Sequence, residues 1–250
     1  DGSQVVGLVN CIEGFSSFAC RPLVNVHDLA VAASHRGRRV GEQMLTVVEQ
    51  IARERGACKI TLEVLSGNLS ANKLYARVGF ESYQLDPAHS WVHFEVEHFA
   101  TSTFRGRIGP VRGEVVWDSR AGRGEVGLTI PTASVDTGLK ILDTRLRSAE
   151  LLDSAAFPDA WFVATVFRHD PARPVITAVR GEFTLHGVSQ PLELTAERFG
   201  CRRPADGSPE VCGGDFVAEL KRSDFGITFG LPFVADRVVL RVQVEGIARR

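Results

Sequence analysis

The chain has 250 residues, which allows one large domain or two modest ones at roughly 100–200 residues per domain. Its 29 basic and 30 acidic side chains are balanced, which argues against a protein that holds nucleic acid or another polyanion by charge. The hydrophobic fraction is 44% and the charged fraction 24%, as in a globular protein, and no run approaches the ~18 apolar residues of a membrane span.

The first 86 residues mix strand-like and helix-like patterns, whereas β-type alternation and glycine- and proline-containing turns dominate the remainder. We therefore expect two domains, at residues 1–86 and 87–250. In chain order, the elements predicted for the first domain are strands at 5–12 and 23–31, a helix at 42–55, a strand at 59–65, a helix at 70–78 and a strand at 80–85.

The helix at 42–55 directly follows a basic turn, SHRGRRVG. Gly56 stands where a C-cap would end this helix. Free backbone N–H groups and the positive end of a helix dipole form an anion site, but a solvated basic turn before a surface helix has the same pattern. Apolar residues at helical spacing predict one buried face, made of Met44, Leu45, Val47, Val48, Ile51 and Ala52.

Three segments of the first domain together resemble the GNAT family of N-acetyltransferases. They are VHDLAVAASHRGRRVGEQML, KITLEVLSGN and NLSANKLYARVGFESYQLDP, and the resemblance spans roughly residues 4–86. It implies a partial mixed sheet of the α+β class, acetyl-CoA as cofactor, and acetyl transfer to an amine. The family's first strand and two helices, which shape the acceptor site, would precede Gln4, so the acceptor amine is not specified.

The same resemblance assigns cofactor contacts residue by residue. Main-chain groups of Leu29 and Val31 would hold the pantetheine arm, and Asn68 would contact the cofactor from a strand end. One position departs from the family pattern, because Arg39 stands where the family loop has its first glycine; a side chain there either obstructs the phosphate or adds a charge contact. The backbone around the pyrophosphate would come from Arg36, Gly37, Arg38, Arg39, Val40 and Gly41.

Two residues are the candidates for acetyl-transfer chemistry. Tyr75 would protonate the departing thiolate, and His27, on the strand beside the cofactor, would be the general base. The alternatives are that Tyr75 is a core aromatic residue and that His27 is a strand histidine whose ring is satisfied by a neighbour.

From residue 89 onward the pattern is that of strands at short spacing, which predicts an antiparallel barrel or sandwich. A barrel of eight strands is about wide enough for one elongated ligand. Leucines at helical spacing predict one helix, at 142–152. The predicted strands are 90–98, 113–117, 125–130, 161–168, 175–185, 192–199, 215–220 and 238–247.

Four blocks of this second part, across residues 84–247, resemble the YceI-like family of lipocalin-type barrels. The first, DPAHSWVHFEVEHFATSTFRGRI, has the family spacing D-P-x-H-S-x-V-x-F-x-V-x-H. The resemblance implies a mainly β, lipocalin-like antiparallel barrel that holds an isoprenoid-type lipid and has no general catalytic activity. The candidate lining residues, which would equally fill a packed core, are Val92, Phe94, Val96, Phe162, Ala164, Val166, Phe183 and Leu185.

Polar residues of the second part give no clear site. Asp136, His98 and His186 lack metal-ligand spacing, and a Ser90–His98–Asp136 arrangement lacks a nucleophile elbow. We therefore expect no metal, and either structural hydrogen bonds or polar groups at the mouth of a pocket. Cys201 and Cys212 flank a turn-rich stretch, where a bridge would suit an oxidising compartment. The visible sequence has no leader, which favours the cytoplasm and reduced thiols; many YceI-like proteins are periplasmic, which is the alternative.

Both resemblances include YQLDPA at residues 83–88, and the strand from Trp91 to Val96 can complete only one of the two folds. Its alternation favours the barrel, so we expect a fusion at a short shared sequence. The primary functional expectation is a barrel that binds a small hydrophobic ligand, with no nucleic acid and a homodimer allowed. The alternatives are an acetyl-CoA-dependent N-acetyltransferase and a first domain without chemistry.

Overall fold

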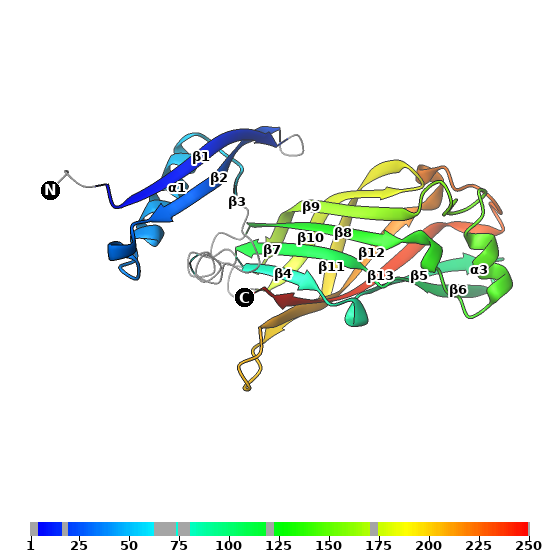
Figure 1. Cartoon of the computed structure of the whole chain (residues 1–250). Coiled ribbons are helices and arrows are strands. Elements are labelled where there is room, and N and C mark those ends of the chain that lie inside the picture. Colours follow the sequence, from blue (N-terminus) through cyan, green and yellow to red (C-terminus); the bar gives the residue numbers. More distant parts are fainter. Residues whose placement is uncertain are drawn as a thin grey trace. The chain divides into compact units, whose positions relative to one another are not determined.

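The computed structural model describes residues 5–16, 20–62, 74, 81–118, 123–170 and 175–249. It divides into two compact units, one of residues 1–80 with residue 250 and one of residues 81–249 (Figure 1). The division precedes the predicted boundary after residue 86, because the strand that we assigned to the first domain, β4 (Glu81–Leu85), pairs with strands of the second unit. Each unit has its own hydrophobic core.

The first unit is a three-stranded mixed sheet with one helix. Strand β1 (Gly7–Ser16) is antiparallel to β2 (Arg21–Val31), and β2 is parallel to β3 (Lys59–Leu62). Helix α1 (Val40–Glu54) contacts all three strands. These elements confirm the predicted mixed sheet; the predicted helix at 70–78 and the end of the strand at 59–65 lie outside the described residues, apart from Leu74.

Helix α1 buries a narrower stripe than predicted. Leu45, Val48 and Ala52 are buried against Val24 and Val26 of β2, at the i, i+3, i+7 spacing of one helix face. Of the other predicted core positions, Met44 is half-buried, whereas Val47 is 55% and Ile51 is 42% exposed. The helix ends as predicted: Gly56 adopts a φ of 67°, and the amide of Ala57 donates back to the carbonyl of Ala52 at 2.9 Å.

The second unit is a closed antiparallel barrel of eight strands, with one further hairpin. The ring runs β4–β7–β8–β9–β10–β11–β12–β13 and closes because β13 pairs with both β12 and β4. This confirms the predicted barrel. The bounds of the strands after β4 are β7 (Arg112–Asp118), β8 (Arg123–Pro131), β9 (Asp159–His169), β10 (Ile176–Leu185), β11 (Val188–Arg202), β12 (Val211–Lys221) and β13 (Val234–Ala248).

Strand β5 (Trp91–His98) also belongs to this unit, which resolves the predicted conflict at the junction. Both β4 and β5 run antiparallel to β13, β4 beside residues 246–248 and β5 beside residues 234–243. They therefore behave as one strand interrupted at residues 86–90. Strand β6 (Ser102–Ile108), which the sequence analysis did not predict, pairs with β5. Helix α3 (Lys140–Leu146) is shorter than predicted, and turns follow it to residue 156.

The interruption is made by the D-P-A-H-S signature. Asp86 accepts hydrogen bonds from the amide of Ala88 at 3.0 Å and from the ring of His89 at 2.6 Å, which fixes a single 3-10 turn at Pro87–His89. The hydroxyl of Ser90 is fully buried and exchanges 3.3 Å hydrogen bonds with the backbone of Glu245 on β13. The signature therefore holds the interrupted strand against β13 through hydrogen bonds.

The barrel interior has two ends with different packing. We call the end that carries α3 and the 3-10 helix Arg222–Phe225 the packed end, because it holds the most deeply buried side chains, Val111 and Phe225. The guanidinium of Arg222 is also buried there and donates four hydrogen bonds to backbone carbonyls of residues 227–235. We call the other end, where β7, β9 and β11 finish, the hollow end.

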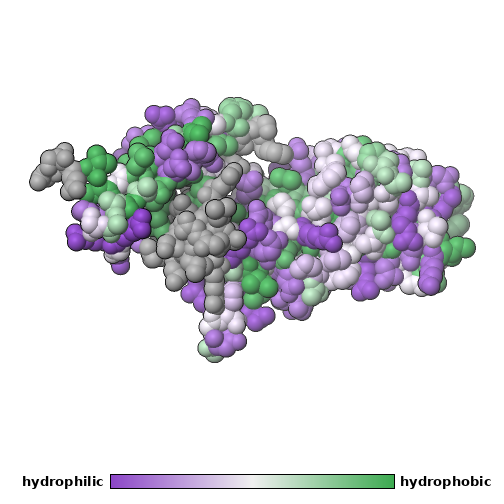
Figure 2. All heavy atoms as spheres, viewed as in Figure 1, coloured by the Kyte–Doolittle hydropathy of each residue, from purple (hydrophilic) through white to green (hydrophobic). Residues whose placement is uncertain are grey.

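Figure 2 shows hydrophilic and pale residues over most of the barrel face in view, with hydrophobic ones scattered among them. Within the described part of the chain, no helix has the length and apolar character needed to cross a membrane.

Candidate functional site: an apolar cavity and a basic turn

The hollow end of the barrel encloses a cavity of about 80 Å³. Every ring strand contributes to its wall, and nearly every lining side chain is aliphatic or aromatic. The lining residues carry no charged side chain, so the cavity suits an apolar group. The lining residues are Tyr83, Leu85, Val115, Trp117, Val126, Leu128, Phe162, Phe167, Ile176, Val179, Leu194, Phe199, Cys212, Gly213, Phe216, Val242, Val244 and Gly246.

Of the eight residues predicted to line a pocket, the structure places Phe162 in the cavity wall. Val92, Ala164 and Phe183 are buried in the barrel core, and Phe94 and Leu185 pack against that core. Val96 is half-buried on β5. Most of the predicted set therefore fills the interior beyond the cavity, which is the alternative that strand alternation left open.

Val166 differs most from the prediction, because it is 52% exposed on the outer surface. The cause is a β-bulge in β9: Ala164 pairs with Gly181 and Val166 with Arg180, so Thr165 has no partner of its own on β10. One extra residue reverses the alternation of every side chain that follows. Phe167 consequently points inward, lines the cavity and packs on Trp117 with ring centroids 5.1 Å apart.

The sequence analysis missed most of the cavity wall for two reasons. Tyr83 and Leu85 lie on the strand that was assigned to the first domain, although they follow an alternating pattern that would have marked an inward face. Trp117 and Phe199 lie at the ends of predicted strands, where one-residue errors in bounds change which face a side chain takes. Pairing of Gly246 with Leu85 joins these distant segments in one wall.

A polar cluster adjoins the cavity through Tyr83. The hydroxyl of Tyr83 donates a 3.0 Å hydrogen bond to Oε1 of Glu210. The other carboxylate oxygen of Glu210 pairs with Nε of Arg203. The Glu210 side chain is only 16% exposed, whereas that of Arg203 is 78% exposed. The cluster therefore leads from the cavity wall to solvent through one phenol, one carboxylate and one guanidinium.

A disulfide lies beside this cluster. Cys201 and Cys212 are direct partners in the β11–β12 register, their Cα atoms are 4.0 Å apart, and their sulfur atoms are bonded. This differs from the expectation of reduced thiols, because the register brings both side chains to the same face of the hairpin. Together with Glu210 they are the described Cys, His and acidic side chains close enough for a metal site, but bonded sulfurs are not thiolate ligands.

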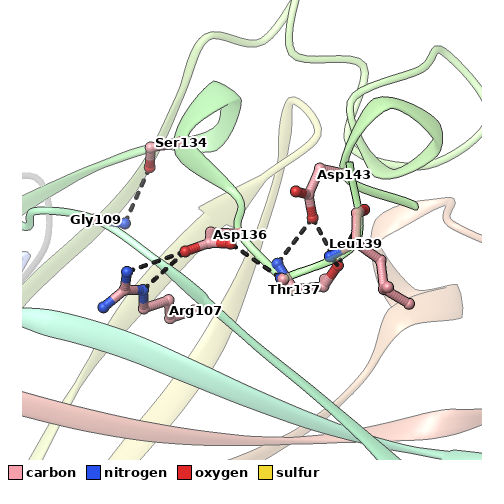
Figure 3. Close-up of polar contacts among 8 residues, drawn as sticks. Arg107, Gly109, Ser134, Asp136, Thr137, Leu139 and Asp143 are labelled. Carbon is pink, nitrogen blue, oxygen red and sulfur yellow. Dashed lines mark hydrogen bonds and ion pairs between the residues drawn. The ribbon is translucent and has the colours of Figure 1, made fainter. Parts of the chain in front are cut away.

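The other polar residues that attracted attention in the sequence do not converge. Figure 3 shows Asp136 paired with Arg107. The Nε and Nη2 atoms of Arg107 donate hydrogen bonds to Oδ2 of Asp136, at 3.1 and 3.0 Å. The amide hydrogen bond from Gly138 and then the Arg107 guanidinium lower the pKa of Asp136. His186 contacts the carbonyl of Phe225, and His98 is exposed beside Phe99. We interpret these groups as structural, as predicted.

The same segment is tied to α3 by a second carboxylate. Asp143, which is buried, accepts hydrogen bonds from the amide of Thr137 at 2.8 Å and from its hydroxyl at 2.7 Å (Figure 3). Ser134 accepts from the amide of Gly109 at 3.0 Å. These contacts hold residues 134–143 against β6, where an isolated bridge joins Arg107 and Asp136.

In the first unit, the predicted cofactor turn leads directly into α1. Gly37 and Arg39 both have left-handed backbones, with φ of 75° and 60°, and α1 begins at Val40. Arg36, Gly37, Arg38 and Arg39 are exposed, whereas Gly41 is buried. A Cβ at Gly41 would lie 2.8 Å from Cδ2 of Leu74, so this glycine permits close packing behind the turn.

The remaining first-unit candidates are placed as follows. Nε of Arg36 donates to the carbonyl of Val31 at 3.1 Å, which joins the turn to the end of β2. Leu29 packs partly buried against the core of the first unit. His27 is exposed at a bulge in β2, because Val26 pairs with Cys11 and Asp28 with Asn10. Tyr75 and Asn68 lie outside the described residues.

Comparison with known proteins assigns both units to families. Residues 83–246 match the YceI-like domain and residues 1–80 match the acetyltransferase (GNAT) family. Protein YceI of Salmonella newport is 32% identical over 171 residues, which is 67% of this chain and 87% of that protein.

Solved structures support the barrel fold. BcnA of Burkholderia cenocepacia, at 22% identity and a TM-score of 0.53, covers 64% of this chain and 98% of its own. A polyisoprenoid binding domain from Saccharophagus degradans, at 20% identity and a TM-score of 0.50, covers 66% of this chain and 98% of its own. At these identities the likeness supports the fold alone. The chain belongs to the YceI-like family, and its YceI-like domain is fused to a GNAT-family segment.

Proposed function

We propose that the barrel binds the hydrocarbon chain of one isoprenoid-type lipid in the cavity at its hollow end. The observation that carries this proposal is the wall itself, which is apolar on every strand of the ring. The Saccharophagus degradans relative of the same fold is a polyisoprenoid binding domain, which supports the ligand class. Burying one five-carbon unit contributes on the order of 3–4 kcal/mol, at ~0.8 kcal/mol per CH₂, so such a wall needs no charged contact to hold a chain.

The size of the cavity sets a condition on binding. Its volume of about 80 Å³ is below the ~150 Å³ of an apolar cavity that accepts benzene. A chain of several isoprene units therefore requires the wall to widen. Trp117 and Phe167 are a pair of large aromatic rings in contact in that wall, and their movement would enlarge it most.

Fluorescence of Trp117 tests the proposal. In a variant carrying Trp91→Phe and Trp161→Phe, Trp117 is the remaining tryptophan and reports directly on the cavity. Titration with a series of isoprenoid alcohols of increasing length should change its emission, with affinity rising per isoprene unit until the cavity is filled. Mass spectrometry of a solvent extract of the purified protein should detect a co-purified lipid. No binding by any chain length, and no extracted lipid, would defeat the proposal.

A matched pair of substitutions separates the cavity from the outer surface. Val115→Phe adds an aromatic ring inside the cavity, whereas Val166→Phe adds the same ring to the exposed face of β9. We expect the first to lower lipid affinity at least tenfold and the second to leave it unchanged. Equal effects of both would point to lipid bound outside the barrel.

A second proposal concerns acetyl-CoA binding by the first unit. The supporting observation is the exposed turn with three arginines at the N-terminal end of a 15-residue helix, where amide N–H groups and the dipole favour a phosphate. When bound, acetyl-CoA would supply the acetyl group. Arg39 departs from the family glycine at a left-handed position, so Arg39→Gly should relieve about 1 kcal/mol of backbone strain and strengthen binding.

Calorimetry with acetyl-CoA decides this second proposal. We expect the Arg39→Gly variant to bind more tightly than the unaltered protein, with Arg53→Gly, at the far end of the same helix, as the control for lost charge. Undetectable heat from both the unaltered protein and the Arg39→Gly variant at millimolar cofactor would exclude the proposal.

We also propose that the protein works in an oxidising compartment. The disulfide between Cys201 and Cys212 supports this, since such bridges persist where thiols are not kept reduced. Cell fractionation followed by thiol labelling checks it: free Cys201 and Cys212 thiols in the native cell would contradict it.

A further inference from the structure

The two cysteines of the disulfide are held opposite each other by the sheet around them. The register between β11 and β12 runs through residues 200–202 and 211–213, so both neighbours of Cys201 and of Cys212 are paired. On its other side, β12 pairs with β13 over the same three residues. Breaking the S–S bond therefore leaves the two side chains facing each other, because the backbone ladder holds the strands in register.

A carboxylate lies beside the two sulfurs. Oε1 of Glu210 is 3.6 Å from Sγ of Cys212, and the donor atoms of Cys201, Glu210 and Cys212 all lie within 4.8 Å of one another. In a tetrahedral zinc site, with Zn–S of about 2.3 Å and Zn–O of about 2.1 Å, sulfur and oxygen lie about 3.6 Å apart and two sulfurs about 3.8 Å apart. The carboxylate is thus already at the distance that a shared metal ion requires, and the sulfurs need only rotate apart once their bond is broken.

Two contacts orient the Glu210 side chain. Its Oε1 accepts a hydrogen bond from the Tyr83 hydroxyl at 3.0 Å, and its Oε2 pairs with Nε of Arg203. A carboxylate oxygen has two lone pairs, so Oε1 can accept from Tyr83 and still bind a metal ion. Outer partners of this kind fix the direction of a metal ligand. The Arg203 guanidinium also balances charge, since Zn²⁺ with two thiolates and one carboxylate carries one net negative charge.

We propose that reduction of the Cys201–Cys212 bridge creates a Zn²⁺ site made of these two thiolates and the Glu210 carboxylate. A dithiol reductant supplies two electrons and two protons: the S–S bond breaks, two thiols form, and the reductant becomes a disulfide. Zn²⁺ then replaces the two thiol protons, which pass to solvent. A water molecule takes the fourth position, as in zinc sites with three protein ligands. The site is independent of lipid binding in the cavity.

The surroundings of the cluster favour zinc and admit both reactants. Thiolate sulfur selects Zn²⁺ over Ca²⁺ and Mg²⁺, which bind oxygen, and zinc also accepts a carboxylate. Cys201 is exposed, so a dithiol and a metal ion reach the bridge from solvent. The Glu210 side chain is 16% exposed, and partial shielding from water strengthens its attraction for a cation. The chain therefore holds either a disulfide or a metal ion at this position, and the thiol poise of its surroundings decides which.

Zinc titration of the unaltered protein in both redox states tests the proposal. The oxidised protein is its own control, because Cys11, Cys20 and Cys58 are thiols in both states. Protein that is reduced with a phosphine, and then freed of it in the absence of air, should bind one more Zn²⁺ per chain in calorimetry than the oxidised protein. Co²⁺ should give the reduced protein additional absorption from cobalt–thiolate bonds. Zinc should also raise the Tm of the reduced protein, as a ligand of the folded state does.

A matched pair of substitutions tests the third ligand. Glu210→Gln keeps the shape of the side chain and removes its charge. We expect the zinc affinity of the reduced protein to fall about tenfold or more, at least the loss that follows removal of an outer partner of a metal ligand. Glu219→Gln, on the same strand and also paired with an arginine, is the control and should leave the affinity unchanged. Replacing both cysteines by serine should abolish the additional zinc.

Three results would overturn the inference. Equal zinc binding by the oxidised and reduced proteins would show that the freed cysteines form no site. Equal affinities of the Glu210→Gln variant and its control would show that this carboxylate is not a ligand. Loss of the β-sheet circular dichroism on reduction would show that the strand ladder does not hold the cysteines in place. Each result is independent of the lipid titrations, so the proposed function of the cavity stands or falls separately.

Discussion

The two ends of the barrel interior are built from the same strands, yet one is filled and the other is hollow. At the packed end, Val111 and Phe225 are 0% and 1% exposed, and the buried guanidinium of Arg222 donates four hydrogen bonds to backbone carbonyls. At the hollow end, Gly213 and Gly246 contribute no side chain to the wall, and a cavity of about 80 Å³ remains. Side-chain volume and strand register, rather than the pattern of polar and apolar residues, separate the filled core from the cavity.

Each end of the barrel interior also holds a buried polar group. At the packed end, the buried guanidinium of Arg222 is hydrogen-bonded internally, to backbone carbonyls of residues 227–235. At the hollow end, the Tyr83 hydroxyl is hydrogen-bonded away from the cavity, to Glu210. In both cases the protein itself supplies the partner of a buried polar group, which leaves the surface of the cavity mainly apolar.

The largest expected effect is at the packed end. Arg222→Met keeps much of the side-chain volume but removes four hydrogen bonds to backbone carbonyls, so we expect the free energy of unfolding to fall by about 3–5 kcal/mol. Urea denaturation measures it. Arg237→Ala, which removes a 63% exposed ion-pair partner of Glu219, should cost at most about 1 kcal/mol. Similar losses for both variants would contradict the description of the packed end.

The next largest effect on stability concerns the disulfide between β11 and β12, beside the hollow end. Replacing Cys201 and Cys212 together by serine opens a loop closed by residues 11 apart, so we expect a loss of about 2–3 kcal/mol in unfolding free energy. Denaturation with and without a reducing agent checks this, because the reductant should destabilise the unaltered protein and leave the double variant unchanged. If the reductant also destabilised the double variant, the loss of unfolding free energy would not come from this disulfide.

A pair of matched substitutions compares the two ends directly. Val111→Leu adds one methylene to a side chain with no exposed surface and should cost about 1–3 kcal/mol through overpacking. Val115→Leu adds the same methylene to the cavity wall and should be neutral or stabilise by up to about 1 kcal/mol. Thermal unfolding of both variants provides the measurement, and an equal cost would mean that the hollow end is already filled.

The smallest effect lies outside both ends, in the signature turn. The hydrogen bond that the His89 ring donates to Asp86 raises the pKa of His89 above its ordinary 6.5. The same bond, followed by the one that the Ala88 amide donates, lowers the pKa of Asp86. The histidine contribution to stability is therefore fully present below pH 6.5 and is lost as pH rises through the raised pKa; the aspartate contribution is lost as pH falls through its lowered pKa.

Proton NMR of the His89 ring tests this turn. Asp86→Asn should bring the His89 pKa back toward 6.5, with little change in overall stability because both side chains are near the surface. An unchanged His89 pKa in that variant would show that the carboxylate is not its partner in solution.

Sequence patterns predicted more of the fold than of the site. Alternation located most of the barrel strands, and the spacing at Leu45, Val48 and Ala52 located α1 with its glycine stop. Both patterns report local geometry, which nearby residues determine. The prediction of the cavity wall was wrong at Val166 and Phe167. The bulge that turns Val166 outward and Phe167 inward arises in the pairing of β9 with β10, which the residues of β9 alone do not reveal.

By itself, the sequence determined the two family assignments, the alternating and helical segments, and the signature that fastens Ser90 to β13. Tertiary structure alone decided that β4 belongs to the barrel, that Cys201 faces Cys212, and that Tyr83 of the cavity wall is hydrogen-bonded to Glu210. The physical reason is that periodicity encodes which side of an element is apolar, whereas a cavity depends on how closely distant strands approach, and only their register sets that distance.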